Sequence, residues 1–325
     1  MIISRTPYRI SFFGGGSDYP EWYNEYNGEV LSSTIDKYVY ISTRTLPAFF
    51  NHKYRLSYSK IEEVRSISQI KHQVVKKAIL HQKIKNNLEI HYDGDLPSRS
   101  GMGSSSSFVV GLLNNFNTLR QKKNNKFDLA YQSIDFEQNV LKECVGSQDQ
   151  VACSIGGFNF IKFYKNDKFK VKNIKDNNYL KMLNQNLVLL YSGQQRTAKV
   201  IAKKFVSKLT KSKKQNIFDI LNILNASKKI LNVKNLDDFG LLLNETWKIK
   251  KTLDSSISNS DIDLIYNKAI KNGALGGKIL GAGGGGFFLF YIHKDKKKKF
   301  LQKMEKLINV DFRFNNLGSQ IIYKE

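Results

Sequence analysis

Glycine and serine residues crowd the segment DLPSRSGMGSSSSFVVGLL at residues 95–113. Gly101 and Gly103 allow backbone conformations that are closed to other residues, and they let a ligand come close to the main chain. Ser104–Ser107 then open a helix, and a helix N-terminus is a favourable site for an anion. An ordinary capped helix needs fewer such residues, so the segment predicts a phosphate loop. It is not a Walker A loop, because no Lys-Ser or Lys-Thr pair follows.

A carboxylate interrupts an apolar stripe in the next predicted helix. The stripe repeats at intervals of three and four residues, as one face of a helix does, and consists of Phe127, Ala130, Ile134, Glu137, Leu141 and Cys144. An inward carboxylate is costly unless it is paired or bound to a metal ion. The spacing slightly favours Glu137 as a metal ligand over an internal ion pair or a position at the edge of the stripe.

Two further glycine runs interrupt predicted strands near the chain ends. Residues 5–19 read RTPYRISFFGGGSDY, where Asp18 follows a tight turn and could accept hydrogen bonds from sugar hydroxyls or simply cap the turn. Residues 278–291, KILGAGGGGFFLFY, contain the glycine spacing of a dinucleotide-binding loop but lead into a strand instead of a helix. We therefore exclude a dinucleotide site there, and a purely structural hairpin is the alternative to a ligand-contacting loop.

Strands and helices segregate along the chain, which predicts an α+β fold of two domains. The N-terminal domain would span residues 1–185 and the C-terminal domain residues 186–325. The alternation over 29–45 suits a half-buried strand paired with 53–58. Further strands are expected near 1–13, 87–93, 157–163, 168–174, 186–192, 276–280 and 286–292, with two more at the end, and helices near 67–83, 103–121, 127–143, 197–209, 214–231, 237–253, 260–271 and 295–307.

The composition favours a cytoplasmic protein. The chain of 325 residues is 41% apolar and has two cysteines, so no disulfide framework is expected. It lacks an apolar run of the roughly 18 to 20 residues that span a membrane. The net charge of +24 could attract nucleic acid, but the lysine runs at 208–216 and 293–300 lack interleaved aromatic residues. We therefore expect a solvated lysine-rich surface and no nucleic-acid or membrane partner.

Four segments, in this order along the chain, resemble the motifs of the GHMP superfamily of sugar kinases. Residues 5–19 are similar to the first motif, with Gly-Gly-Gly in the pattern of the D-glycero-D-manno-heptose 7-phosphate kinases and, in related form, of the fucokinases. Residues 97–105 resemble the second motif, Pro-x-x-x-Gly-Leu-Gly-Ser-Ser, with Met102 in place of Leu. Residues 144–158 resemble the Gly-x-x-Asp-Gln element, and residues 278–290 resemble the third motif.

The resemblance implies an active site in the cleft between the two domains, with ATP and Mg²⁺ as cofactors. It implies that Asp149 is the general base, and that Arg9 supports this carboxylate and the transferring phosphoryl group. It places Mg²⁺ on Ser105 and Glu137. The residues implied to hold the ATP phosphates are Pro97, Ser100, Gly101, Met102, Gly103, Ser104, Ser105 and Ser106, and those implied to lie near the sugar are Gly15, Gly16, Ser17, Asp18, Gly283 and Gly284.

The resemblance further implies phosphorylation of the anomeric hydroxyl of D-glycero-D-manno-heptose 7-phosphate, which gives the 1,7-bisphosphate for GDP-heptose and surface polysaccharides. The alternatives are another sugar 1-kinase such as a fucokinase, a basic nucleic-acid-binding protein, and a sugar-binding regulator without catalysis. Arg196, in a glycine-containing strand-to-helix turn, is our candidate for binding the phosphate of the substrate, although a solvated Arg is the alternative. The oligomeric state stays open, with a homodimer as one candidate.

Overall fold

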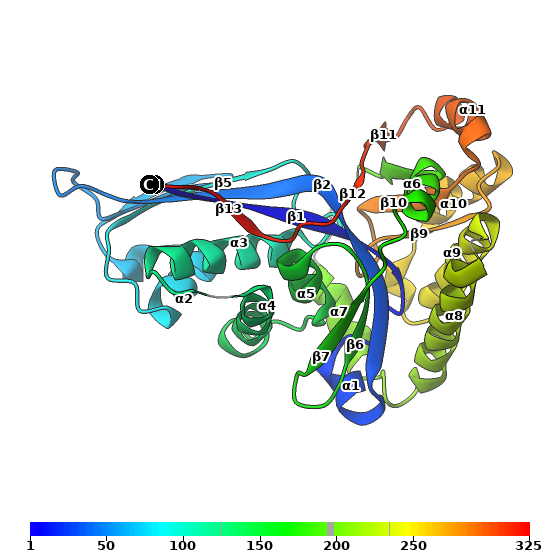
Figure 1. Cartoon of the computed structure of the whole chain (residues 1–325), viewed down its shortest axis with the longest axis horizontal. Coiled ribbons are helices and arrows are strands. Elements are labelled where there is room, and N and C mark those ends of the chain that lie inside the picture. Colours follow the sequence, from blue (N-terminus) through cyan, green and yellow to red (C-terminus); the bar gives the residue numbers. More distant parts are fainter. Residues whose placement is uncertain (124, 194–197, 234) are drawn as a thin grey trace.

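Two β-sheets of unequal size organise the molecule (Figure 1). The computed structural model describes every residue except 124, 194–197 and 234. The first sheet contains nine strands and the second contains four. The two chain ends lie side by side on the first sheet, where the Met1 amino group is 3.4 Å from Glu325 Oε2. No helix in the described part of the chain is both long and apolar enough to cross a bilayer.

The first sheet is built around a long, bent strand, β2. Its strands are β1 (Ile2–Phe13), β2 (Gly28–Thr45), β3 (Tyr54–Ser57), β4 (Ile61–Val64), β5 (Leu88–Gly94), β6 (Phe158–Phe163), β7 (Phe169–Asn173), β12 (Phe314–Asn315) and β13 (Gln320–Lys324). The first part of β2 pairs with β6 and the last part with β5, while β1 runs along its other edge. The expected pairing of 53–58 with 29–45 is therefore wrong, because β1 and β5 occupy both edges of β2, and β3 pairs with β4 and β5 instead.

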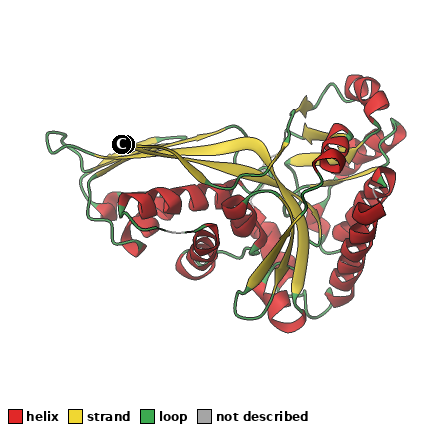
Figure 2. Ribbon diagram, in the orientation of Figure 1, coloured by secondary structure: helices red, strands yellow, loops and turns green. Residues whose placement is uncertain are grey.

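Helices cover one face of the first sheet (Figures 1 and 2). They are α2 (Gln73–His81), α3 (Ser104–Leu119), α4 (Lys126–Asp135) and α5 (Gln148–Ile155), while α1 (Pro20–Tyr26) lies between β1 and β2 in the chain. The helix α3 packs on β1 and β2 and buries Val109, Leu112 and Phe116. Gly111 permits this close approach, because a Cβ atom there would lie 2.9 Å from Thr6 Oγ1.

The second sheet has the order β11-β8-β10-β9. It consists of β8 (Leu187–Tyr191), β9 (Gly276–Ile279), β10 (Phe287–Tyr291) and β11 (Ile308–Asn309), and its helices are α6 (Asn177–Gln185), α7 (Ala198–Val206), α8 (Lys214–Val233), α9 (Leu236–Lys251), α10 (Ser260–Lys271) and α11 (Lys297–Lys303). Neither α1 nor α6 was predicted from the sequence, and α6 begins where the Asp176 side chain accepts a hydrogen bond from Tyr179 N. The final strands, β12 and β13, return to the first sheet. The proposed division at residue 185 thus leaves the last strands of the C-terminal part in the N-terminal sheet.

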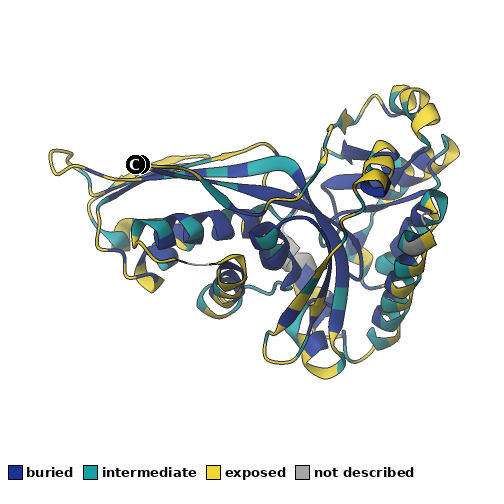
Figure 3. Cartoon of the chain, viewed as in Figure 1, coloured by how far each residue is buried: buried dark blue, intermediate teal, exposed yellow. Residues whose placement is uncertain are grey.

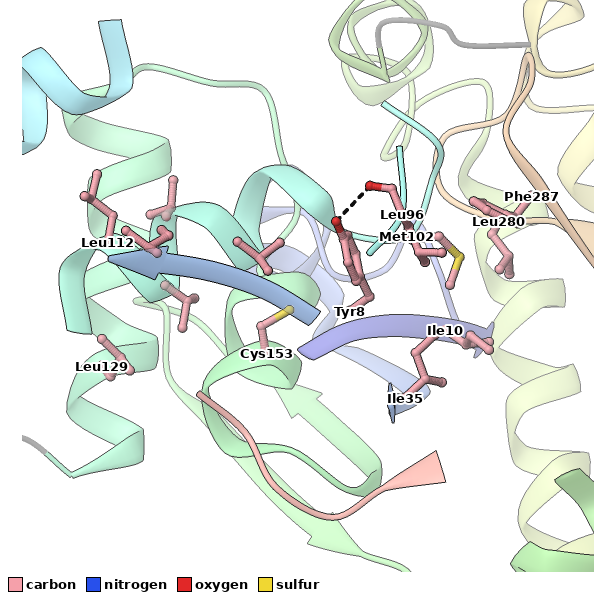
Figure 4. Packing of buried hydrophobic residues seen from close by; sticks show 14 of the residues in the cluster. Tyr8, Ile10, Ile35, Leu96, Met102, Leu112, Leu129, Cys153, Leu280 and Phe287 are labelled. Carbon is pink, nitrogen blue, oxygen red and sulfur yellow. Dashed lines mark hydrogen bonds between the residues drawn. The ribbon is translucent and has the colours of Figure 1, made fainter. Parts of the chain in front are cut away.

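A continuous apolar core joins the two sheets (Figures 3 and 4). Phe12 and Phe13 end β1, and both rings lie edge to face with the Phe239 ring on α9, with centroids 5.4 and 5.0 Å from that of Phe239. These three side chains are fully buried. Elsewhere in the same core, the Tyr8 hydroxyl donates a hydrogen bond of 3.0 Å to Leu96 O (Figure 4). The contact through Phe239 therefore fixes α9 to the strand that leads into the first glycine turn.

Truncation of Phe239 to Ala should destabilise the whole fold. We expect the free energy of unfolding to fall by about 3–5 kcal/mol, because a large buried ring is removed from a contact that joins both sheets. Leu241→Ala is the matched control on the same helix, since that side chain is 49% exposed, and it should change stability by no more than about 0.5 kcal/mol. Urea unfolding followed by circular dichroism measures both, and equal effects would contradict this description of the core.

Candidate active site

A cleft of about 410 Å³ opens between the two sheets. The N-terminal half contributes the end of β1, the glycine turn after it, the phosphate loop and the segment 143–149. The C-terminal half contributes α7, α9 and the second glycine loop. Of the residues that the sequence analysis selected, the cleft brings together Arg9, Gly15, Gly16, Asp18, Gly101, Gly103, Ser104, Ser105, Ser106, Asp149 and Gly283.

Arg9 and Asp149 form a two-pronged ion pair on the wall of this cleft. Arg9 Nε donates to Asp149 Oδ1 and Arg9 Nη2 donates to Asp149 Oδ2, both at 2.6 Å. The Arg9 side chain is 5% exposed and that of Asp149 is 23% exposed, so the carboxylate is the part that remains open to a ligand. Asp149 lies in the first turn of α5, where the helix dipole favours a negative charge. A carboxylate has about four lone-pair sites, so Asp149 can still accept a proton from a substrate hydroxyl.

The same arginine also fixes the shape of the phosphate loop. Arg9 Nη1 donates to Gly101 O at 2.7 Å, and the Arg9 main-chain N–H donates to Met102 O at 3.1 Å. Gly103 adopts φ 77° directly before α3, and a Cβ atom there would lie 3.3 Å from Asp149 Oδ2. The first N–H groups of α3 therefore begin beside the ion pair, where a phosphate anion would be favoured.

The remaining residues of the predicted phosphate loop support its conformation. Ser100 is fully buried, and its hydroxyl donates to Pro97 O at 2.6 Å. The Met102 side chain belongs to the apolar core, together with Leu96 and Leu280 (Figure 4). Pro97, Ser100 and Met102 do not line the cleft, so their predicted contact with ATP is not seen in the geometry. Arg99, which the sequence analysis did not select, does line it.

Glu137 lies behind the phosphate loop in a π-helical turn, Phe136–Val140. This turn interrupts the predicted continuous helix and directs the carboxylate to Ser106, whose hydroxyl donates to it at 2.7 Å, and to the Gln150 amide. Ser105 Oγ is 3.5 Å from the other carboxylate oxygen. Glu137 is 1% exposed, and this burial raises the pKa of its carboxyl to about 7. Its hydrogen-bond partners are neutral groups, and the charges of Asp149 and Glu143 add to the rise in its pKa, so a bound cation would favour the ionised carboxylate.

The first glycine turn presents Asp18 to the cleft. Gly16 N donates to Asp18 Oδ1 at 3.0 Å, and burial, together with the charge of Asp149, raises the pKa of Asp18 to about 6. Ser17 points the other way: it is fully buried, and its hydroxyl contacts Gly14 O at 2.8 Å and Glu29 O at 3.0 Å. The geometry gives Ser17 a structural role in the turn instead of a sugar contact.

The second glycine loop packs against the phosphate loop. Gly281 meets Gly101 so closely that a Cβ atom on Gly281 would lie 2.6 Å from Gly101 Cα. Gly283 lines the cleft, whereas Gly284 does not and instead donates its N–H to Ile257 O at 2.8 Å. Arg196, the candidate for binding the phosphate of the substrate, lies outside the described residues.

Besides Arg99, the polar residues of the cleft that were not predicted from the sequence include Gln148, Lys250 and Lys278. Gln148 is 5% exposed beside the ion pair, and its side-chain carbonyl has no hydrogen-bond partner among the described residues. Lys250 and Lys278 also line the cleft. A signal for both lysines exists in the sequence: Lys278 is the one charged residue in the buried strand β9, and Lys250 continues the spacing of the buried residues Phe239, Leu243 and Trp247 along α9.

Comparison with known proteins gives two matches to family models. Residues 68–157 match the N-terminal domain of the GHMP kinases, and residues 226–309 match the GHMP kinase C-terminal domain. The chain is 30% identical to the D-glycero-alpha-D-manno-heptose 7-phosphate kinase of Campylobacter jejuni, over 98% of this chain and 97% of that protein.

Two further comparisons extend this result. The bifunctional fucokinase/GDP-fucose pyrophosphorylase of Arabidopsis thaliana is 25% identical over 95% of this chain, which spans 32% of that longer protein. The crystal structure of a D-glycero-D-manno-heptose 1-phosphate kinase from Bacteroides thetaiotaomicron superposes with a TM-score of 0.78 at 23% identity, with full coverage of both chains. The chain therefore belongs to the GHMP kinases, a family of ATP-dependent phosphotransferases, and has their two-domain fold.

Proposed function

We propose that this kinase transfers the γ-phosphoryl group of ATP to the anomeric hydroxyl of D-glycero-D-manno-heptose 7-phosphate in the cytoplasm. The observation that carries the proposal is the Arg9–Asp149 ion pair between the phosphate loop and the Asp18 turn. It puts a carboxylate where a nucleotide phosphate and a sugar hydroxyl can meet. The identity to the Campylobacter jejuni heptose 7-phosphate kinase supports the choice of sugar.

In this mechanism the residues of the chain align two substrates and neutralise charge. Asp149 accepts the proton of the attacking hydroxyl, and Arg9 holds the carboxylate in place and faces the transferring group. The N–H groups at the start of α3 bind the phosphates of ATP. Asp18, on its glycine turn, accepts hydrogen bonds from sugar hydroxyls. The product would be the 1,7-bisphosphate.

Ser105 and Glu137 are the residues that would hold Mg²⁺. A buried carboxylate beside two serine hydroxyls is a hard oxygen donor set, which suits this ion. Within the described residues there is no cluster of three or more His, Cys, Asp or Glu side chains that could bind a metal ion by themselves. That agrees with an ion held by one carboxylate and by ligands from the nucleotide. Bound there, Mg²⁺ would neutralise charge on the ATP phosphates.

A fucokinase is the second candidate, and the similarity to the plant enzyme over 95% of this chain favours it. The side-by-side release of ADP from ATP with heptose 7-phosphate, heptose 1-phosphate, heptose, mannose, fucose and galactose separates the two. We expect kcat/KM for heptose 7-phosphate to exceed that for every other sugar by at least about tenfold, a difference of about 1.4 kcal/mol. A preference for fucose would contradict the proposed substrate while leaving sugar kinase activity intact.

Asp149→Asn should preserve the fold and nucleotide binding but lower turnover. A drop of about a hundredfold or more is expected, which is the scale of a lost general base. Steady-state kinetics give the turnover number, and calorimetric titration with ATP provides the binding control. If the variant turned over at nearly the wild-type rate, Asp149 would have no role as the base.

Glu137→Gln should change how stability depends on pH. Because the folded-state pKa of about 7 lies above the ordinary value of 4.5, the contribution of Glu137 to wild-type stability is fully present at low pH and is lost as pH rises through 7. The neutral variant lacks this loss, so its stability relative to wild type should rise between pH 5 and pH 8, by at most about 3 kcal/mol. Urea unfolding without nucleotide or metal measures this difference.

Addition of MgATP at pH 8 is the second arm of the same experiment. It should stabilise the wild type more than Glu137→Gln, because the ionised carboxylate binds the cation and the amide does not. A stability difference that stays constant from pH 5 to pH 8, with equal stabilisation by MgATP, would make Glu137 a structural residue only.

A further inference from the structure

Three cationic side chains gather on the wall of the cleft. They are Arg9 on β1, Lys250 on α9 and Lys278 on β9, and all three line the cleft. Arg9 is paired with Asp149. Neither lysine forms an ion pair with a carboxylate within the described part of the chain, although Lys278 is 4% exposed. A buried ammonium group and a partly buried one beside an arginine are unfavourable unless anions balance their charge.

Main-chain carbonyls fix the position of both ammonium groups. Lys278 Nζ donates to Ser11 O at 3.1 Å and to Phe12 O at 2.7 Å. Lys250 Nζ donates to Ile279 O at 2.9 Å and also to Gly281 O. An ammonium group has three N–H donors, so each lysine keeps one that no carbonyl of the described residues accepts. The lysines are thereby held in place with a donor left for a ligand in the cleft.

The electrostatic environment agrees with a missing anion. Burial, with the nearby charge of Arg9, lowers the pKa of Lys278 to about 7, although the charge of Asp18 acts in the opposite direction. Burial and the charges of Lys278 and Arg9 hold the pKa of Lys250 well below its usual value. A bound anion would restore the protonated state of both lysines, because an opposite charge favours the charged form.

The loops around the lysines indicate which anion that is. Lys250 binds the carbonyl of Gly281, and Gly281 packs directly against Gly101 of the phosphate loop. The carbonyl of Gly101 in turn accepts the hydrogen bond from Arg9 Nη1. Lys278 binds the main chain of β1 just before the first glycine turn, which carries Asp18. The three cations therefore line the part of the cleft that is bordered by the phosphate loop and the first glycine turn, beside Asp149.

We propose that Lys250 and Lys278 are catalytic residues that bind the γ-phosphoryl group of ATP during its transfer. This inference rests on the proposed phosphoryl transfer, but it does not depend on which sugar is the acceptor. In the step, the bond from the γ-phosphorus to the bridging oxygen breaks and ADP keeps the electron pair. A bond from the sugar oxygen to phosphorus forms, and the hydroxyl proton goes to Asp149. The lysines and Arg9 neutralise the charge on the non-bridging oxygens.

Lys250→Met and Lys278→Met test the proposal through turnover. Each should lower kcat by about a hundredfold, the scale of one lost donor to a developing charge. The loss should be the same with phosphorylated and unphosphorylated heptose, and KM for the sugar should change little. Lys248→Met is the matched control on α9, because that side chain is 61% exposed and paired with Glu245, and it should leave kcat unchanged. An unchanged kcat in both cleft variants, or a loss confined to KM for the phosphorylated sugar, would overturn the assignment.

A binding measurement separates this role from a structural one. ADP with Mg²⁺ and aluminium fluoride imitates the transferring phosphoryl group and needs no sugar, so a wrong choice of acceptor leaves the readout intact. Calorimetry should show that both variants keep wild-type affinity for ADP alone but lose at least about tenfold in affinity when aluminium fluoride is present. Equal losses with and without aluminium fluoride would mean that the lysines only hold the loops together.

Discussion

The bidentate contact between Arg9 and Asp149 is the interaction on which the rest of the site depends. It joins β1 to the first turn of α5, and through Gly101 O and Met102 O the same arginine also shapes the phosphate loop. The two glycine loops can then meet, because neither Gly101 nor Gly281 has a side chain to separate them. One buried guanidinium thus sets the relative positions of a candidate base, a phosphate site and the wall of the sugar site.

Burial shifts the pKa values of three ionisable groups at the site. Burial raises the pKa values of Asp18 and Glu137 to about 6 and about 7, and it lowers that of Lys278 to about 7. Each of these groups is therefore held away from its preferred charge state. In our proposal a magnesium ion restores the charge of Glu137 and a phosphoryl group restores that of the lysines, so substrate binding supplies the charges that the fold leaves unmatched.

The sequence predicted the local motifs well and the long-range geometry less well. Most strands and most helices were expected near their observed positions, since periodicity and glycine runs are local signals, but elements such as β4, α1 and α6 were not expected. The predicted pairing of residues 53–58 with 29–45 was wrong, because strand order depends on which strand edges are already occupied. The π-helical turn at Glu137 could not be read from helical spacing, and the roles of Ser17 and Met102 follow from packing. Lys250 and Lys278 were missed although each falls on a buried pattern, because a lysine at such a position can also extend its ammonium group to solvent.

A double-mutant cycle on the central ion pair tests this account most directly. Arg9→Met, Asp149→Asn and the double variant would be compared through kcat/KM with the best acceptor sugar. Because the two side chains act as one unit, we expect the double variant to lose no more than about the larger of the two single losses. Losses that multiply, as for independent sites, would contradict the claim that the active site is organised around this pair.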